Sequence, residues 1–315
     1  MRDASPMTMM PTMPENAPLM IFDRKLLATH RARAAANFAT FDFLVQRVGQ
    51  EIADRLSLIN RVFPLALDLG CHTGRLSRSN LAAGKIATLI SADLAPAMLA
   101  DMQGIRVAAD EEALPFADRS FQLIVSALSL HWVNDLPGTL IQIRRALAPD
   151  GLFIGALLGG DTLTELRQAL SEAEIECDGG LSPRVSPFVD LRDMGMLMQR
   201  AGFALPVVDS DRVTVRYANM FALMADLRGM GETNALIERR KTPLRRSTFL
   251  RAAQIYQEKF GLADGRIAAT FEIITATGWA PHDSQQKPLQ PGSATTRLAD
   301  ALGTQETPAG DKAPR

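Results

Sequence analysis

The sequence predicts an α/β fold in which helices cover both faces of a mostly parallel, seven-stranded sheet. Strands that alternate with helices are typical of right-handed βαβ units. Almost continuously apolar strands indicate a sheet that is buried on both faces. Five short apolar runs carry this pattern, and they are Leu65–Leu69, Ala87–Ala92, Ile105–Ala109, Phe121–Leu128 and Leu152–Leu158.

The remaining elements follow from spacing and from end signals. Apolar residues at helical spacing predict a helix over 41–57, preceded by another near 24–36. A helix is expected between each strand and the next, for example over 136–147. Thr162 and Glu165 form a capping-box pattern that predicts the start of the next helix. The later elements expected are helices over 162–174, 191–201, 220–227 and 249–260 and strands over 207–217 and 270–279.

The chain is expected to hold one elaborated domain between two loose ends. Residues 20–284 would form the domain, with extra helices inserted after Gly160. Residues 1–19 are rich in Met and Pro and are predicted to be a disordered extension. Residues 285–315 are rich in Pro, Gly, Gln and Thr, which predicts a mostly disordered tail.

Composition excludes several classes of function. The 315 residues carry 34 Lys and Arg and 35 Asp and Glu, so no nucleic-acid partner is expected. Two cysteines, Cys71 and Cys177, cannot build a disulfide scaffold or a four-thiolate zinc site. No apolar run is long enough to span a bilayer. The first 19 residues lack signal-peptide and presequence features, which predicts a bacterial cytoplasm, or the matrix side of the mitochondrion in a eukaryote.

A glycine-containing loop follows the first strand of the sheet. Residues 65–74 read LALDLGCHTG, so an apolar strand runs into Asp68, Gly70, Cys71, His72 and Gly74. Ligands of open α/β sheets bind beyond the carboxyl ends of the strands, and a helix expected after this loop would offer free N–H groups. Glycines there allow a ligand to approach the backbone closely.

Acidic residues at the ends of the next two strands indicate which class of ligand this site binds. Asp93 follows the second strand and can accept both hydroxyls of a ribose. Asp110 and Glu111 follow the third, where an acid can accept an adenine amino group. A Walker lysine is missing, so triphosphate binding is not predicted. An adenosine with a non-phosphate tail is the ligand indicated.

This combination resembles the class I methyltransferases, which bind S-adenosylmethionine in a Rossmann-like fold. The resemblance implies that Asp68, Gly70 and Gly74 hold the methionine end, Asp93 the ribose and Asp110 the adenine. His72 departs from the pattern, because the family usually has glycine there. The cofactor-binding set implied is Asp68, Gly70, Cys71, His72, Gly74, Asp93, Leu94, Asp110, Glu111 and Ser126.

A closer resemblance extends from about Met20 to about Thr295. The segments LHWVNDLP, GGDTLTELR, ADLRGMGETNA and GWAPHDSQQKP look like the complex I assembly factor 5 family. This resemblance implies arginine hydroxylation of a core complex I subunit that carries an iron–sulfur cluster, early in assembly. Any membrane association would then be peripheral and arise through that partner. No metal site is expected, since the four histidines form no His-x-Asp/Glu pair.

Catalytic candidates follow the fourth and fifth strands. His131 could act as a base with Trp132 walling the pocket, or the two could simply close the strand end. Asp161 could face the substrate, although a helix cap is favoured. The segments 184–188 and 229–234 could cover or shape the substrate side, or be an ordinary connection and an ordinary helix stop.

Two other functions remain open. More distantly, the chain resembles the malonyl-thioester O-methyltransferase of biotin synthesis, including the Gly-Met-Gly-x-Thr-Asn segment, which implies ordinary methyl transfer. The protein could also be a non-catalytic assembly chaperone.

Overall fold

The computed structural model describes residues 20–75, 84–286, 292–293 and 295–305. The chain divides into two units, Met1–Pro281 and His282–Arg315. In the second unit the described residues include one short helix, α9 (Leu298–Leu302). The expected disordered extension, 1–19, lies outside the described residues. In the described part of the chain, no helix has the length and apolar character needed to cross a membrane.

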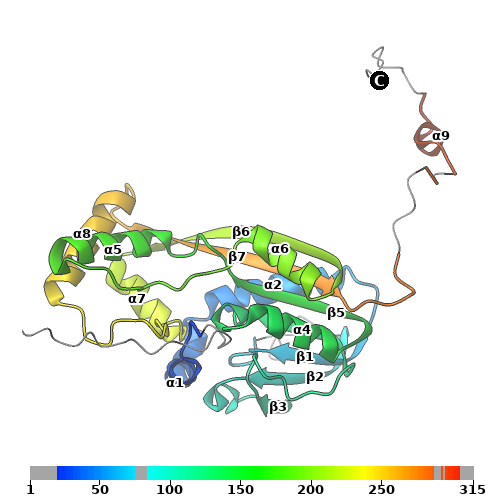
Figure 1. The fold of residues 1–315 in the computed structure, drawn as a ribbon, viewed down its shortest axis with the longest axis horizontal. Helices are drawn as coiled ribbons and strands as arrows, with labels where there is room; N and C mark the ends of the chain where they lie inside the picture. The colour runs from blue at the N-terminus through cyan, green and yellow to red at the C-terminus, as the bar shows by residue number, and fades with distance from the viewer. Residues whose placement is uncertain (1–19, 76–83, 287–291, 294, 306–315) are drawn as a thin grey trace, which may run out of the picture. The chain divides into compact units, whose positions relative to one another are not determined.

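The first unit is built on a seven-stranded sheet in the order β3-β2-β1-β4-β5-β7-β6 (Figure 1). The strands β3, β2, β1, β4 and β5 pair in parallel, whereas β7 runs antiparallel to both β5 and β6. The sheet confirms the predicted fold class. Its strands are β1 (Phe63–Leu69), β2 (Ile86–Asp93), β3 (Ile105–Ala108), β4 (Phe121–Ala127), β5 (Leu147–Leu158), β6 (Ala204–Tyr217) and β7 (Ile267–Trp279).

Helices pack on both faces of this sheet. On one face, α2 contributes Leu44, Val48 and Ile52 to a core that also holds buried residues of α5, α7 and α8. On the other, α4 and α6 contribute Leu140 and Met194 to a second core. The helices are α1 (Arg24–Ala34), α2 (Phe43–Ser57), α4 (Leu136–Ala146), α5 (Thr164–Asp178), α6 (Leu191–Arg200), α7 (Met220–Gly229) and α8 (Arg246–Phe260). Short 3-10 helices are η1 (Ala35–Thr40), η3 (Pro96–Leu99) and η4 (Leu130–Trp132).

The expected helix between every pair of strands is wrong in one crossover. Between β3 and β4, residues 109–120 form turns and an isolated bridge rather than a helix. Two local features explain this. Pro115 cannot donate a helical hydrogen bond, and the Asp110 side chain accepts the N–H of Glu112 in a turn. The helix expected after Gly74 lies outside the described residues.

The predicted capping box at Thr162 and Glu165 is also wrong. The Thr162 hydroxyl donates to the backbone carbonyl of Glu272 on β7, and the Glu165 carboxylate accepts from Thr270 on the same strand. The residue that precedes α5 is Leu163, in the left-handed conformation and without a side-chain cap. Tertiary contacts with β7 have therefore replaced the local contacts of a capping box.

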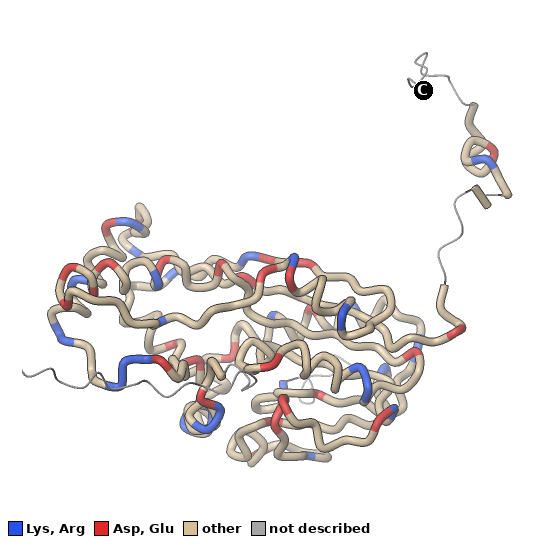
Figure 2. Tube along the Cα trace, in the orientation of Figure 1, with Lys and Arg blue, Asp and Glu red and all other residues tan. Residues whose placement is uncertain are grey.

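Acidic and basic residues are interspersed along the described trace of the chain (Figure 2). This agrees with the nearly balanced total of 34 basic and 35 acidic residues. Two basic residues of the segment after Leu236, Arg240 and Arg245, lie within ion-pair distance of Asp178 at the end of α5.

Candidate functional site

The glycine loop lies at the carboxyl end of β1. Gly70 and Gly74 have φ angles of +67° and +76°, a region that favours glycine. A β-carbon on Gly70 would collide with the side chain of Ser129, which follows β4. The loop therefore passes too close to the β4 end to carry a side chain at this position.

His72 lies in the same loop, where contacts of its ring and of its backbone fix it. It is 2% exposed, its ring stacks on Phe38, and its backbone N–H donates to Asp93 at 2.9 Å. The ring Nε2 lies 3.1 Å from the carbonyl oxygen of Ala127, so Nε2 carries the proton of this bond. Burial, followed by the charge of Arg31, lowers the pKa of His72. The ring is therefore neutral, and Nδ1 is a buried acceptor without a partner.

Asp93 ends β2 and organises the loops around it. Its carboxylate is fully buried and accepts the N–H groups of His72 and Ala95, at 2.9 and 2.8 Å. Backbone donors thus fix the carboxylate beside the glycine loop. The next residue, Leu94, packs with Phe22 and Trp132 instead of lying free in the crevice.

An arginine of α1 lies beside this carboxylate. Arg31 is 1% exposed, and its Nη1 lies 3.6 Å from Asp93 and 3.0 Å from Glu111. Its Nη2 donates to Ser129 at 2.8 Å. Burial would raise the pKa of Glu111, but Arg31 and Arg24 outweigh it and lower that pKa to about 2. Sequence analysis missed Arg31, because nothing local in α1 distinguishes it from its neighbour Arg33.

The two acids after β3 differ in their surroundings. Glu111 is fully buried, whereas the side chain of Asp110 is 34% exposed. Both pair with Arg24 of α1. Arg31 therefore connects Glu111 with Asp93, whereas Asp110 lies toward the surface.

Asp68 in β1 and Cys71 in the glycine loop are both buried. Asp68 is 3% exposed, and burial followed by the charge of Asp93 raises its pKa to about 7. Burial, Asp68 and Asp93 also raise the pKa of Cys71, which packs against Leu99 and Met102. A thiol held protonated in an apolar cluster has no nucleophilic role.

Ser126, which was predicted to bind the cofactor, lies apart from Asp68 and Cys71. Its neighbours Val125 and Ala127 line a small cavity with Asp68 and Cys71. Because side chains alternate along a strand, Ser126 faces the other side of β4. Its hydroxyl is buried there without a hydrogen-bond partner among the described residues.

A second cluster joins the end of β4 to the segment after α7. Glu232 Oε2 lies 3.0 Å from His131 Nε2 and accepts the indole N–H of Trp132 at 2.8 Å. His131 and Trp132 are 6% and 2% exposed. His131 Nδ1 is buried without a described partner. Sequence analysis named the 229–234 segment but missed Glu232, which lies about a hundred positions from its partners.

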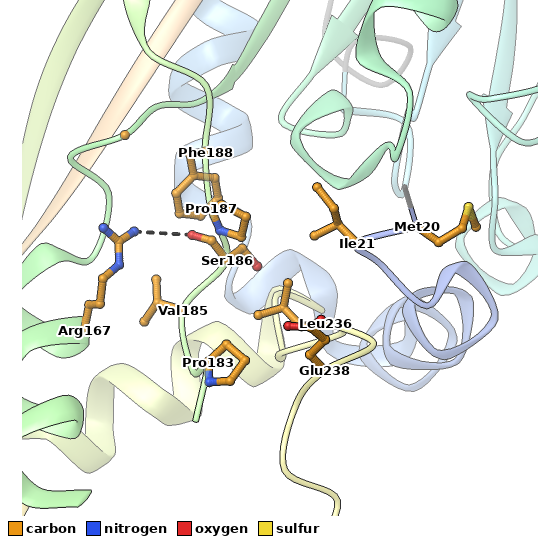
Figure 3. A pocket seen from close by; sticks show the side chains of 11 residues that line it. Met20, Ile21, Arg167, Pro183, Val185, Ser186, Pro187, Phe188, Leu236 and Glu238 are labelled. Atoms are coloured by element: carbon orange, nitrogen blue, oxygen red, sulfur yellow. Dashed lines mark hydrogen bonds between the residues drawn. The ribbon is translucent and has the colours of Figure 1, made fainter. Parts of the chain in front are cut away.

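Three cavities lead toward this cluster. The outer cavity, about 640 Å³, lies between the N-terminal segment and the 183–188 loop, where Arg167 donates to the backbone carbonyl of Ser186 (Figure 3). The apolar cavity, about 200 Å³, shares Val185, Ser186 and Phe188 with it and reaches Trp132 and Glu232. The inner cavity, about 30 Å³, shares Leu158, Leu227 and Glu232 with the apolar one and is also lined by His72 and His131.

Asp161 stands apart from these cavities. Its side chain is about half exposed and pairs with Arg212 on β6. It does not cap α5, so the favoured cap interpretation is wrong, and it lines none of the three cavities. Arg184, by contrast, lines the apolar cavity and pairs with Glu174.

The carboxyl ends of β1, β2 and β3 bring together groups of the kind that hold a nucleoside, and we call this region the crevice. It has a glycine turn with no room for a side chain and the buried carboxylates of Asp93 and Glu111. Arg31 lies between these two acids. Across the described ranges, no group of three or more His, Cys, Asp and Glu side chains could hold a metal ion.

The N-terminal segment is attached to the segment that carries Glu232. Phe22 forms an antiparallel bridge with Leu236. The N–H of Asp23 donates to the carbonyl of Ala235 at 2.8 Å, and the N–H of Ile237 donates to that of Ile21 at 2.9 Å. We call these paired residues, 21–23 and 235–237, the terminal ladder.

Comparisons with known proteins agree with this architecture. A family profile described as "Methyltransferase domain" matches residues 67–155, the part that holds the loop and the first strands. A solved structure of a methyltransferase from Bacillus halodurans superimposes with a TM-score of 0.51 at 15% identity, covering 74% of this chain and 99% of the other. Identity this low shows a shared fold alone.

Two groups of curated proteins are similar over most of their length. Arginine-hydroxylase NDUFAF5 of Rattus norvegicus is 45% identical over 296 residues, covering 92% of this chain and 86% of the relative. Malonyl-[acyl-carrier protein] O-methyltransferase of Xylella fastidiosa is 35% identical over 270 residues, covering 83% of this chain and 89% of the relative.

Proposed function

The chain belongs to the arginine-hydroxylase NDUFAF5 family, an enzyme family of the class I methyltransferase fold, and from this we propose that it hydroxylates an arginine side chain of a protein partner. The observation that carries the proposal is the near full-length similarity at 45% identity. The partner proposed is a core complex I subunit that carries an iron–sulfur cluster, modified during assembly. The protein would then act in a bacterial cytoplasm, or on the matrix side of the mitochondrion.

We further propose that the crevice binds S-adenosylmethionine. Asp93 and Glu111 would hold its adenosine, with the glycine loop and Asp68 near its methionine end. Bound there, the cofactor would supply a positively charged methylsulfonium group. Binding requires that the Arg31 side chain give up its contacts with Asp93 and Glu111.

The chain's own residues position the partner's side chain. Trp132 and the apolar cavity exclude water around it. Glu232 fixes the His131 ring through Nε2, and His131 also lines the inner cavity. These groups hold and orient an arginine. Its hydroxylation replaces a C–H bond by C–OH and would use dioxygen with two electrons from a reductant outside this protein, while the second oxygen atom leaves as water.

The test is peptide mass spectrometry of complex I subunits from cells with and without the gene. Loss of one oxygen mass from an arginine in the deletion strain, restored by the wild-type gene, is the expected result. Subunits identical in the two strains would contradict the proposed function.

A second candidate function is methyl transfer to a carrier-bound malonyl group. The observation that favours it is 35% identity over 270 residues with the methyltransferase of Xylella fastidiosa. Transfer of a labelled methyl group to malonyl-loaded carrier protein would support it. Normal biotin-independent growth of a deletion strain that has no other such enzyme would exclude it.

A further inference from the structure

The cavities that meet at Glu232 offer hydrogen-bond acceptors without partners. Among the residues that line the apolar and inner cavities, the buried ring nitrogens without a partner are His72 Nδ1 and His131 Nδ1. Glu232 Oε2 is used by His131 and Trp132, while no described donor contacts Oε1 and 15% of this side chain is accessible. An occupant that supplies several N–H donors would satisfy this set.

The Glu232 carboxylate carries a negative charge. Burial would raise the pKa of Glu232, but His131 and Arg31 outweigh it and keep that pKa below its ordinary value. Glu232 is therefore ionised, and its Oε2 is held by His131 Nε2 and by the indole N–H of Trp132. A carboxylate fixed in this way at a cavity wall can pair with a cationic ligand.

The lining of the apolar cavity suits the methylene groups of a long side chain. Leu166, Leu170, Met224, Leu244 and Phe249 line it together with Trp132 and Glu232, and Glu232 also lines the inner cavity. Arg184 is neutralised by Glu174, and Arg228 is exposed. An arginine side chain matches this arrangement, because three methylene groups carry a planar guanidinium with five donors.

We propose that Glu232 receives the guanidinium group of the substrate arginine, whose aliphatic stem lies in the apolar cavity. This inference rests on the proposed function and identifies the residue that recognises its substrate. The same carboxylate rejects a malonyl group, because two carboxylates close together in a buried pocket repel each other. Glu232 is thus a specificity-determining residue that favours arginine chemistry over malonyl methylation.

The experiment uses the full chain and a spectroscopic signal at the site itself. The protein has two tryptophans, so the indole N–H resonances of Trp132 and Trp279 can be assigned with a Trp279→Phe variant. Nα-acetyl-arginine methylamide is titrated, with its neutral citrulline counterpart as the matched probe, with and without S-adenosylmethionine. The arginine probe is expected to shift and saturate the Trp132 indole signal, and the citrulline probe to bind at least tenfold more weakly.

Two substitutions separate recognition from folding. Glu232→Gln keeps an oxygen for His131 and Trp132 but removes the charge, and it should weaken the arginine probe at least tenfold. Glu238→Gln removes an exposed charge from the outer cavity and should leave binding unchanged. Equal binding of the two probes, or undiminished binding to Glu232→Gln, would overturn the inference.

The same variants distinguish this inference from the proposed function. Cells that carry Glu232→Gln should lose the hydroxylated arginine, while cells with Glu238→Gln keep it. Full hydroxylation with Glu232→Gln would refute recognition by Glu232 and leave the hydroxylase function standing. Charge-dependent binding of arginine without hydroxylation in wild-type cells would refute the function and leave the guanidinium site standing.

Discussion

The guanidinium of Arg31 lies 3.0 Å from the Glu111 carboxylate and 3.6 Å from that of Asp93, so one side chain of α1 joins the ends of β2 and β3. All three side chains are buried. Both carboxylates are thus paired with a buried cation in this structure. Arg31 is therefore a structural residue, and in the proposed mode of cofactor binding it is also the group that a nucleoside would displace.

Replacing Arg31 should destabilise the protein strongly. Arg31→Met removes the buried cation beside Asp93 and leaves Glu111 with Arg24 alone, and breaking buried pairs in this way typically costs about 3–5 kcal/mol. Arg33→Met, an exposed change in the same helix, should alter the free energy of unfolding by less than about 0.5 kcal/mol. Urea denaturation of the three proteins measures both values. Equal stability of the two variants would show that the ion pairs of Arg31 with Asp93 and Glu111 contribute nothing to the free energy of unfolding.

Gly70→Ala should disrupt the glycine loop beyond the ordinary strain of a positive φ angle. A β-carbon there collides with Ser129, whereas a β-carbon on Gly84, also at positive φ, meets nothing within 4 Å. Gly84→Ala should therefore cost only the conformational strain of about 1–2 kcal/mol. Gly70→Ala should cost more and weaken cofactor binding. Thermal unfolding and S-adenosylmethionine titration of both variants test the difference.

The affinity for S-adenosylmethionine should depend on Asp93. Loss of a charge-assisted hydrogen bond typically costs about 1.5–3 kcal/mol, so Asp93→Asn should weaken binding about 10- to 150-fold. Asp110→Asn changes a carboxylate that is 34% exposed and should weaken binding about fivefold or less. Calorimetric titration measures both. If Asp93→Asn binds like the wild type, the ribose assignment is wrong.

Stability should fall with rising pH because of Asp68. Its pKa is raised from 3.8 to about 7, so between these values the folded protein holds a proton that the unfolded chain has released. This stabilisation is complete below about pH 4 and is lost as the pH rises to about 7, at up to roughly 1.4 kcal/mol per pH unit. Asp68→Asn should remove this slope, whereas exposed Asp101→Asn should keep it. Urea denaturation from pH 4.5 to 8 provides the comparison.

The order of strands and helices could be predicted because each element carries its own local pattern. The helix of residues 41–57 begins at Phe43 in the structure, and the late strands 207–217 and 270–279 lengthen to 204–217 and 267–279. One failure, the missing helix between β3 and β4, has local causes, and the other occurs where distant contacts replace local ones. Thr162 and Glu165 have capping chemistry, but both bond to β7 instead.

The site was predicted in part for the same reason. Asp68, Gly70 and Asp93 are marked by their position at strand ends, and the structure places them together at one edge of the sheet. Arg31 and Glu232 come from segments far away in sequence, and their roles depend on burial against these groups. Periodicity and spacing carry no information about such pairings.

The terminal ladder connects α1 with the segment that carries Glu232. Residues 21–23 lead into α1, which carries Arg31, and residues 235–237 lie just after Glu232. A shift of α1 that accompanies cofactor binding would therefore reach the wall of the apolar cavity through these backbone pairs. The cofactor should then dissociate more slowly when the arginine probe is bound. Rapid exchange of labelled S-adenosylmethionine from the complex with bound arginine probe would show that the two segments move independently.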